Sequence, residues 1–479
     1  MDTPSLLTIL ATILPLLHLL GIISAIDVLF RTASSQGAIA WCLFLTIFPV
    51  LGLPIYWTLG RSRFHGYTQR ISRVLQHSQK ELQWYREQVR EHATVPADPE
   101  PGRAETLARI AEASFVGGNS VELLVDGQAT FAAILSAIDR AQSYVLVEFF
   151  IIKDDQIGRD FKGSLIAAAR RGVSVCLLYD EVGSHDLPSS YLDELREAGV
   201  QVSCFGTRRG GFRNFFQVNF RNHRKIVVID GQVAFNGGLN VGDEYLGRSK
   251  RFGRWRDTHI KISGPAALHL KSIFFADWVW ATGSPPSVRM LPPTPSGATV
   301  MLTIPSGPAD GREAALLFFL HAISSARSRV WIASPYFIPD DSVTGALKLA
   351  ALRGVDVRII LPQKRDHLIV WLASFFFIPL VCARGTKAFR YTGGFLHEKV
   401  VVIDDHYASV GRANCDNRSF RLNFEATSVV ADSAFVNRVA SMLEEDMANS
   451  VDVSQQKPSG LPFWKRVGSS IARLFSPVL

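Results

Sequence analysis

The chain has 479 residues and a net charge of +8, and 47% of its residues are hydrophobic. This length accommodates two or three domains, and a mean hydropathy of +0.14 is high for a soluble protein and indicates membrane segments. The five cysteines are widely spaced and none forms a Cys-x-x-Cys pair, which argues against a disulfide framework and against a zinc site. The net positive charge is equally compatible with binding to nucleic acid and with binding to an anionic membrane surface.

Two apolar runs open the chain, the first from Leu6 to Ile26 and the second from Gly37 to Leu59. Each has the length that a bilayer-spanning helix needs. A signal peptide is the alternative for the first run, but residues 1–5 contain an acid and no base, which argues against it. The sequence therefore predicts a two-helix transmembrane hairpin within residues 1–60.

Basic residues predict the orientation of this hairpin. Arg31 is the one base between the two runs, whereas the second run is followed by a basic cluster consisting of Arg61, Arg63, His65, Arg70 and Arg73. Positive charge favours the cytoplasmic side of a membrane, although the cluster is also compatible with a solvated helix face. We expect a multi-pass protein of the cell inner membrane, with both termini and the catalytic part in the cytoplasm.

The remainder of the chain reads as an internal repeat. Residues 61–118 form a basic helix and a Pro-rich linker, and strands then alternate with helices twice, in residues 119–290 and in residues 298–450. The segment Arg171-Gly172-Val173 of the first half matches Arg353-Gly354-Val355 of the second. This pattern predicts two tandem α/β domains.

Each half carries the same motif: His-x-Lys, four residues, Asp, six residues, Gly, and an Asn three residues after that Gly. Its members are His223, Lys225, Asp230 and Asn240 in the first half and His397, Lys399, Asp404 and Asn414 in the second. The apolar residues between Lys and Asp are β-branched and predict a buried strand, on which His and Lys share a face. A turn after the Asp, strongest at Asp230-Gly231, brings the Asn back towards the His.

These two motifs resemble the signature motifs of the phospholipase D superfamily. The segments Gly242–Gly247, Ser334–Asp340 and Asp416–Glu425 are similar to those of bacterial cardiolipin synthases, and the resemblance extends over nearly the whole chain. It implies two phospholipase D-like domains related by pseudo-twofold symmetry. It also implies chemistry that needs no cofactor and no metal ion.

The resemblance implies a two-step displacement at phosphorus. His223 would form a phosphohistidine, and His397 would protonate the leaving alkoxide and then deprotonate the incoming alcohol. Asp257 and Glu425 match the carboxylates that orient the family's histidines. Donors to the phosphoryl oxygens would be Lys225, Lys399, Asn240 and Asn414. The family analogy gives Asp230 and Asp404 a more structural role, as partners near the lysines.

One residue departs from the family pattern. A Ser or Thr usually follows the Gly of the second motif, and this chain has Arg412 there. Arg412 could hold a phosphate head group, or it could crowd the site and weaken activity. The sequence leaves both interpretations open.

Three further segments have two interpretations each. The aromatic and basic segment Phe212–Arg221 could stack nucleic-acid bases or enter a lipid interface, and the apolar runs upstream favour lipid. The apolar segment Leu368–Cys382 is either a buried core helix or an acyl-chain groove. Residues 451–479 resemble a basic amphipathic helix that either packs on the catalytic body or binds the membrane, the second being favoured; its apolar positions are Trp464, Val467, Ile471, Leu474 and Phe475.

The resemblance implies a membrane-bound phosphatidyltransferase that joins two phosphatidylglycerol molecules into cardiolipin and releases glycerol. Its partners would be phosphatidylglycerol and anionic lipids, and not nucleic acid. A phospholipase D or a phosphatidylserine synthase would differ only in the acceptor. The membrane hairpin counts against a nuclease, and the two complete motifs count against a non-catalytic scaffold. The sequence leaves the acceptor, the acyl preference and the oligomeric state open.

Overall fold

The computed structural model describes residues 6–32, 34–60, 64–206, 219–309 and 311–479. The chain forms two compact units, one of Met1–His65 with Thr207–Phe220 and the other of Gly66–Gly206 with Arg221–Leu479. Residues 212–218 of the aromatic and basic segment Phe212–Arg221 lie outside the described residues. Its predicted contact with lipid is therefore an expectation from sequence alone.

The smaller unit contains α1 (Leu6–Arg31), α2 (Ser35–Ile47) and α3 (Pro49–Leu59). Among the described residues, α1 is the one helix long and apolar enough to cross a bilayer. The second apolar run does not form the continuous helix that we expected. Phe48 leaves the helical region at φ −125° and ψ 57°, and Pro49, which has no N–H, begins the next helix.

Helix α3 folds back along α2. The rings of Trp41 and Tyr56 are 5.3 Å apart, whereas one straight helix would separate these residues by roughly 22 Å. The far end of α3 is tied to α1, because Tyr56 donates to Asp27 at 2.9 Å and Trp57 donates to Ser24 at 3.1 Å. The three helices therefore pack as one cluster in which α2 and α3 are each about half the length of a spanning helix.

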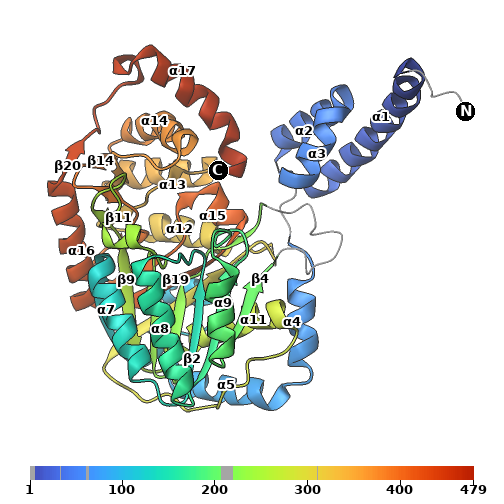
Figure 1. Cartoon of the computed structure of the whole chain (residues 1–479). Coiled ribbons are helices and arrows are strands. Elements are labelled where there is room, and N and C mark those ends of the chain that lie inside the picture. Colours follow the sequence, from blue (N-terminus) through green and yellow to red (C-terminus); the bar gives the residue numbers. More distant parts are fainter. Residues whose placement is uncertain (1–5, 33, 61–63, 207–218, 310) are drawn as a thin grey trace, which may run out of the picture. The chain divides into compact units, whose positions relative to one another are not determined.

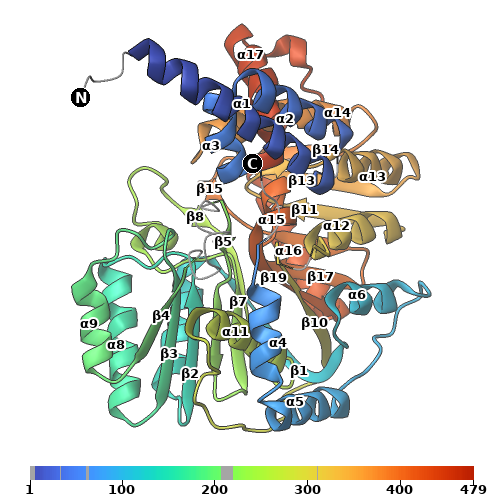
Figure 2. The same cartoon turned by 90° about the vertical axis from the view of Figure 1, so that its right-hand side faces the viewer.

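The larger unit is built on a sheet of sixteen strands to which both halves of the repeat contribute (Figures 1 and 2). The strand order is β20-β14-β13-β11-β16-β17-β19-β10-β1-β9-β7-β6-β2-β3-β4, and the sixteenth strand, β5, pairs with β19 outside this order. The order of the first half mirrors that of the second, and the two halves meet where β1 (Val116–Val125) pairs antiparallel with β10 (Thr299–Ser306). The predicted arrangement of two tandem α/β domains is confirmed.

Short strands with apolar β-branched residues form the two half-sheets. The other strands of the first half are β2 (Tyr144–Phe149), β3 (Ser174–Asp180), β4 (Gln201–Phe205), β5 (Arg221–Asn222), β6 (Ile226–Ile229), β7 (Val233–Gly237), β8 (Trp255–Arg256) and β9 (Thr258–Ser263). Those of the second half are β11 (Arg329–Ala333), β12 (Phe337–Ile338), β13 (Asp356–Pro362), β14 (Lys387–Tyr391), β15 (Phe395–Leu396), β16 (Val400–Ile403), β17 (Tyr407–Gly411), β18 (Cys415–Asp416), β19 (Asn423–Ala431) and β20 (Ser450–Asp452).

Helices cover both faces of the sheet, so β6 and β16 are buried along their whole length. Before β1 the chain forms α4 (Tyr67–Leu75), α5 (Gln79–Glu91) and α6 (Arg103–Ala111). The helices of the first half are α7 (Asp126–Asp139), α8 (Gln156–Arg170), α9 (Ser189–Glu197), η2 (Asp243–Leu246) and α11 (Ala267–Thr282). Those that follow are α12 (Ala314–Ser325), α13 (Asp341–Leu352), α14 (Leu368–Cys382), α15 (Asn417–Arg421), α16 (Ser433–Ala448), η3 (Pro458–Gly460), α17 (Phe463–Ala472) and η4 (Arg473–Val478).

The aspartates of the two motifs end their strands and do not lie near the lysines, contrary to our expectation. Asp230 has a positive φ of 52°, and its carboxylate accepts the backbone N–H groups of Ser143 at 2.7 Å and Tyr144 at 2.8 Å. The whole of β6 separates it from Lys225, a distance of roughly 16 Å along the strand. Asp230 thus fixes the turn that joins β6 to β7.

Asp404 has the corresponding position and a further partner. It accepts the N–H groups of Ser328 at 2.8 Å and Arg329 at 3.1 Å, and its other oxygen lies 2.7 Å from Arg103 Nη1. Burial alone would raise the pKa of the Asp404 carboxyl, but these donors outweigh burial and hold the pKa below its ordinary value. The ionised carboxylate therefore stabilises the fold at neutral pH.

We expect Asp404→Ala to lower the free energy of unfolding by about 2–4 kcal/mol, because it leaves the backbone N–H groups of Ser328 and Arg329 and Nη1 of Arg103 without their acceptor. The neighbouring Asp405→Ala is the matched control. It removes an ion pair with Arg329 in which the Asp405 side chain is 67% exposed, and it should cost less than about 1 kcal/mol. Thermal unfolding of the purified variants measures both, and equal losses would contradict this role of Asp404.

Candidate active site

Two short strand pairs place the histidines, and each pair joins one half of the unit to the other. Strand β5 runs parallel to β19, and the His223 N–H donates to the Phe424 carbonyl at 3.0 Å. Strand β15 runs parallel to β8, and the His397 N–H donates to the Arg256 carbonyl at 2.7 Å. The backbone of each His-x-Lys segment is thus held by a strand of the opposite half.

The carboxylates come from the same places, because Glu425 lies on β19 and Asp257 directly follows β8. His223 Nδ1 lies 3.3 Å from Glu425 Oε1, and His397 Nδ1 lies 2.7 Å from Asp257 Oδ2. Each histidine therefore pairs with the carboxylate that follows the motif of the other half. The order of residues along the chain does not show this exchange, because Asp257 follows the first motif and Glu425 the second.

Both lysines lie beside their histidines. Lys225 Nζ donates to the His223 carbonyl at 3.0 Å, and Lys399 Nζ donates to the His397 carbonyl and lies 2.6 Å from His397 Nδ1. Burial, together with the charge of Arg412, holds the pKa of both ammonium groups well below its ordinary value. The site therefore brings basic side chains together in an environment that destabilises their charged forms.

The same environment keeps the histidines neutral. Burial, Arg412 and Lys225 lower the pKa of His223 well below 6.5, and burial and Lys399 lower that of His397 to about 3. Burial would raise the pKa of Asp257, but Lys399 and His397 outweigh it and keep this carboxyl ionised. Neutral imidazoles that donate through Nδ1 to a carboxylate keep a lone pair on Nε2.

Glu425 differs from Asp257. Burial raises the pKa of its carboxyl to about 7, although Arg412 and Lys225 oppose this rise. Its Oε1 accepts from Asn423 at 3.2 Å and from Ser419 at 3.3 Å in addition to facing His223. The two histidines therefore have partners whose protonation differs near neutral pH.

Arg412 has contacts that neither interpretation of the sequence anticipated. Its side chain is 1% exposed, and it extends from the end of β17 into the first half. Nε donates to the carbonyl of His223 at 3.0 Å, and Nη1 donates to the carbonyl of Gly238 at 2.5 Å. Arg412 thus holds two backbone segments of the first half and adds its charge to both histidine environments.

The asparagines of the two motifs are buried, and some of their polar atoms already form hydrogen bonds within the protein. Asn240 donates from Nδ2 to Tyr245 at 2.9 Å and accepts the Ile151 N–H at 3.2 Å. The Asn414 N–H donates to Ser419 Oγ at 3.0 Å, and the same hydroxyl donates to Glu425. The structure thus connects Asn414 to His223 through Ser419 and Glu425.

Three residues near the histidines were not among the predicted site residues. Asn423 Nδ2 lies 3.3 Å from His223 Nδ1, and the ring of Phe150 lies 4.3 Å from the His223 ring. Trp255 lies 5.1 Å from the His397 ring. Asn423 and Trp255 each stand two residues before a carboxylate of the site, a spacing that places them on the same face of a strand. Phe150 has no comparable signal in the sequence.

The residue between His and Lys anchors each motif through an ion pair. This residue is positively charged in the first half and negatively charged in the second. In the first half, Arg224 Nη1 lies 2.5 Å from Asp277 of α11. In the second half, Glu398 lies 3.4 Å from Arg256, which in turn pairs with Asp446 of α16 at 2.7 Å. Helix α11 follows β9 and α16 follows β19, which have matching places in the two halves of the sheet, so the two anchors correspond in position and are opposite in charge.

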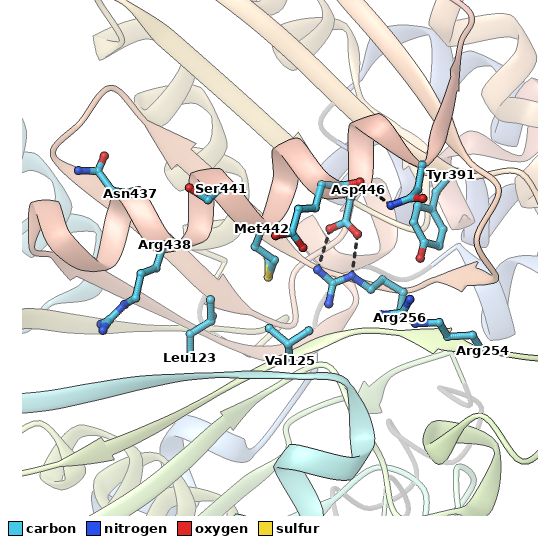
Figure 3. A pocket seen from close by; sticks show the side chains of 12 residues that line it. Leu123, Val125, Arg254, Arg256, Tyr391, Asn437, Arg438, Ser441, Met442 and Asp446 are labelled. Carbon is cyan, nitrogen blue, oxygen red and sulfur yellow. Dashed lines mark hydrogen bonds and ion pairs between the residues drawn. The ribbon is translucent and has the colours of Figure 1, made fainter.

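The Arg256–Asp446 pair also forms a wall of a pocket of about 470 Å³ between β1 and α16 (Figure 3). Arg256 precedes Asp257, so this pocket lies behind the His397 side of the site, and neither histidine lines it. No group of three or more His, Cys, Asp or Glu side chains placed to hold a metal ion occurs in the described residues.

Comparison with known proteins agrees with this geometry. The family described as "Cardiolipin synthase, PLD-like domain" matches residues 134–284 and 319–447, which together make up more than half of the chain. The chain belongs to this family of phospholipase D-like proteins. The family described as "Phospholipase_D-nuclease N-terminal" matches residues 19–61 of the smaller unit.

The relatives of this family member extend over its whole length. It is 45% identical over 470 residues to "Cardiolipin synthase A" of Pseudomonas putida and 46% identical to that of Pseudomonas fluorescens, with 98% of each chain covered. Among solved structures, a phosphatidylserine synthase of Haemophilus influenzae matches 83% of this chain and 99% of its own, with a TM-score of 0.57 at 12% identity. That similarity shows a shared fold.

We expect Arg412→Thr to raise the pKa of His223 toward its ordinary value, because Arg412 is the largest charge that lowers it. Thr is the residue type that the family pattern favours, and it cannot reach both carbonyls. The rate at which diethyl pyrocarbonate modifies His223, followed by peptide mass spectrometry as a function of pH, measures the shift. Arg421→Thr, which removes ion pairs with Glu313 and Asp340, is the control and should leave the profile unchanged. An unchanged profile in both variants would contradict this role of Arg412.

Proposed function

We propose that the protein is a cardiolipin synthase that transfers a phosphatidyl group from one phosphatidylglycerol to another and releases glycerol. The observation that carries this proposal is the pair of neutral histidines, His397 buried and His223 partly buried, each oriented through Nδ1 by a carboxylate and accompanied by a lysine. Such a pair suits in-line displacement at a phosphodiester, whose negative charge the lysines and Arg412 attract. The 45% and 46% sequence identity to cardiolipin synthases of Pseudomonas, over 98% of each chain, supports phosphatidylglycerol as both donor and acceptor.

In the first step, Nε2 of His223 attacks phosphorus and the bond from phosphorus to the glycerol oxygen breaks. The leaving oxygen needs a proton, and His397 is neutral in the free site. An anionic phosphodiester offsets the charges of Lys399 and Arg412 that lower the pKa of His397, so substrate binding favours proton uptake there. The protonated His397 then gives its proton to the departing glycerol.

In the second step, a glycerol hydroxyl of another phosphatidylglycerol attacks the phosphohistidine. His397, now neutral, takes the proton of that hydroxyl, and the bond between His223 and phosphorus breaks. One phosphodiester replaces another, so the reaction needs no external energy source. Asp257 and Glu425 hold the imidazoles in the required orientation throughout, as positioning residues.

Donors to the phosphoryl oxygens complete the proposed site. Lys225 and Lys399 are the ammonium donors, and the side-chain amides of Asn240 and Asn414 supply N–H groups. Arg412 acts through the carbonyls of the first half that it holds. Asp230 and Asp404 support the turns of the two motif strands.

The test of this function is incubation of the purified protein with phosphatidylglycerol as the only lipid. The proposal requires cardiolipin and an equal amount of glycerol, and phosphatidic acid as the sole product would identify a phospholipase D instead. The roles of the histidines are separated with a phosphatidyl ester of nitrophenol, whose leaving group needs no proton. His397→Ala should still form an acid-labile phosphoryl adduct on His223, and His223→Ala should form none. An adduct on His397 would reverse the assignment.

Activity should rise with pH through about 7, because the ionised form of Glu425 orients His223 and its pKa is raised to about 7. Protonation of His223 itself does not explain this step, since its pKa lies well below 6.5. Glu425→Gln should lower kcat by about a hundredfold and remove the step from the pH profile. A step that persists in Glu425→Gln would assign the ionisation to another group.

The proposed division of the chain assigns residues 1–60 to a membrane anchor, 61–118 to a juxtamembrane helix and linker, 119–290 and 298–450 to the two phospholipase D-like domains, and 451–479 to a tail. We place the anchor in the cell inner membrane and the catalytic unit in the cytoplasm. The basic cluster after α3 supports this side.

The contacts within the smaller unit support a topology other than the two-span hairpin. If α1 alone spans, α2 and α3 enter the bilayer and return to the side of Arg31, with their turn at the level of Gly21, beside Leu45 and Pro49. Arg31 and the basic cluster then share the cytoplasmic side, and the amino terminus lies outside. A two-span hairpin would instead keep both termini in the cytoplasm.

Reciprocal cysteine labelling distinguishes these topologies. In a variant whose five native cysteines are replaced, we expect Thr3→Cys to react with a membrane-impermeant maleimide in intact cells and Ser35→Cys to react only after lysis. A two-span hairpin gives the opposite result at both positions. Labelling of neither residue in intact cells would contradict both topologies.

A further inference from the structure

The tail helix packs against the catalytic unit with its small residues. Gly468 faces α14 so closely that a Cβ there would lie 3.2 Å from Leu372 Cδ1. Ser469 and Ala472, which follow it on the same side of α17, are 5% and 3% exposed. The alternative in which the tail packs on the catalytic body therefore holds for these small residues, but the large apolar side chains do not make this contact.

Those large side chains face outward. Phe463 is 77% exposed and Leu474 is 70% exposed, which is unusual for apolar residues on a helix packed against a domain. Leu368 and Ile369, one turn before Leu372 on α14, are each 47% exposed. We call this group the tail surface; it consists of Phe463, Trp464, Val467, Ile471, Leu474, Phe475, Leu368 and Ile369.

Basic residues accompany the tail surface. Residues 453–479 contain Lys457, Lys465, Arg466 and Arg473 and no Asp or Glu. Lys465 lies 5.0 Å from the centres of the Trp371 and Phe375 rings, and Arg473 lies 4.3 Å from that of Phe376. These cation–π contacts fix the tail on α14 and leave its apolar face turned away from the protein.

The start of α14 links the tail surface to the candidate active site. Asp366, two residues before α14, accepts a hydrogen bond from Tyr336, and its charge contributes to the environment of Lys399. Figures 1 and 2 show α14 and α17 at one end of the larger unit and α5 at the opposite end. A partner that binds the tail surface therefore also fixes the position of Asp366 and of the site residues near it.

We propose that the tail surface inserts into the interfacial layer of an anionic lipid bilayer and holds the active site at the depth of the phosphodiester head groups. Exposed aromatic and aliphatic side chains flanked by bases, with no acid among them, match the chemistry of an anionic interface. A protein partner would have to offer an acidic rim around an apolar centre, whereas the proposed substrate lies in such a bilayer. The inference rests on the proposed function for the identity of the lipid.

Photocrosslinking of the full-length protein tests the contact without requiring turnover. p-Benzoylphenylalanine replaces Phe475 in one variant and Val95, which is 70% exposed near α5, in the other. Both carry His223→Ala, so that the lipid is not consumed, and both are reconstituted in vesicles of phosphatidylcholine and phosphatidylglycerol. We expect lipid adducts at position 475 and none at position 95, with fewer at 475 in vesicles of phosphatidylcholine alone.

Other adducts at position 475 would overturn the inference. Crosslinks to peptides of α1–α3 would mean that the chain's own membrane helices cover the tail surface, and crosslinks to a second copy would mean that it is a dimer interface. Absence of any adduct would mean that it faces water. Equal lipid adducts at positions 475 and 95 would show that the labelling is not specific to this surface.

A kinetic comparison separates this inference from the proposed function. Leu474→Glu places a charge on the tail surface outside the active site, and it should lower kcat/KM on vesicles about tenfold while leaving turnover in detergent micelles unchanged. Equal activity on vesicles would overturn the inference. If the unmodified protein makes no cardiolipin at all, the proposed function fails, and the crosslinking result still decides whether the tail surface contacts lipid.

Discussion

The candidate site holds more buried positive charge than negative charge, and this imbalance governs its chemistry. Lys225, Lys399 and Arg412 face Asp257 and Glu425, and Glu425 has a pKa of about 7 and is only partly ionised at neutral pH. The excess positive charge contributes to the lowered pKa values of the lysines and histidines. An anionic phosphodiester compensates this charge, so the free site is electrostatically incomplete until a substrate of the right charge enters it.

The fold tolerates this imbalance because backbone contacts fix the charged groups from both sides. The two-residue pairs β5–β19 and β15–β8 hold the histidines, and Arg412 holds the His223 carbonyl from the opposite half. Ion pairs with α11 and α16 anchor the position between His and Lys in each half. Burial, together with repulsion among the cations, therefore lowers their pKa values. The repulsion does not open the site, since moving one group would break contacts in both halves.

The sequence predicted those features that depend on short-range patterns. Lys225 to Asp230 reads as a strand with a turn because its β-branched run and turn residues are contiguous, and the repeat predicted two α/β domains. It did not reveal that Glu425 faces His223, because that pair joins residues about two hundred positions apart. Hydropathy missed the break at Phe48, since a turn between two apolar helices leaves the average unchanged. Helical periodicity identified the apolar side of α17, but it does not tell which side packs against the body.

The exchange of carboxylates between the halves also limits how this chain can evolve. A recombination event with a crossover between the two domains would take His223 from one parent and Glu425 from the other. It would divide the pair of His397 and Asp257 in the same way, together with the contact of Arg412 with the His223 carbonyl. In an ordinary two-domain protein, the linker between the domains is a place where recombination can exchange one domain. In this chain the two halves cannot be exchanged independently, although a linker separates them in sequence. Chimeras of distant relatives joined at this linker would need matched substitutions on both sides of the junction.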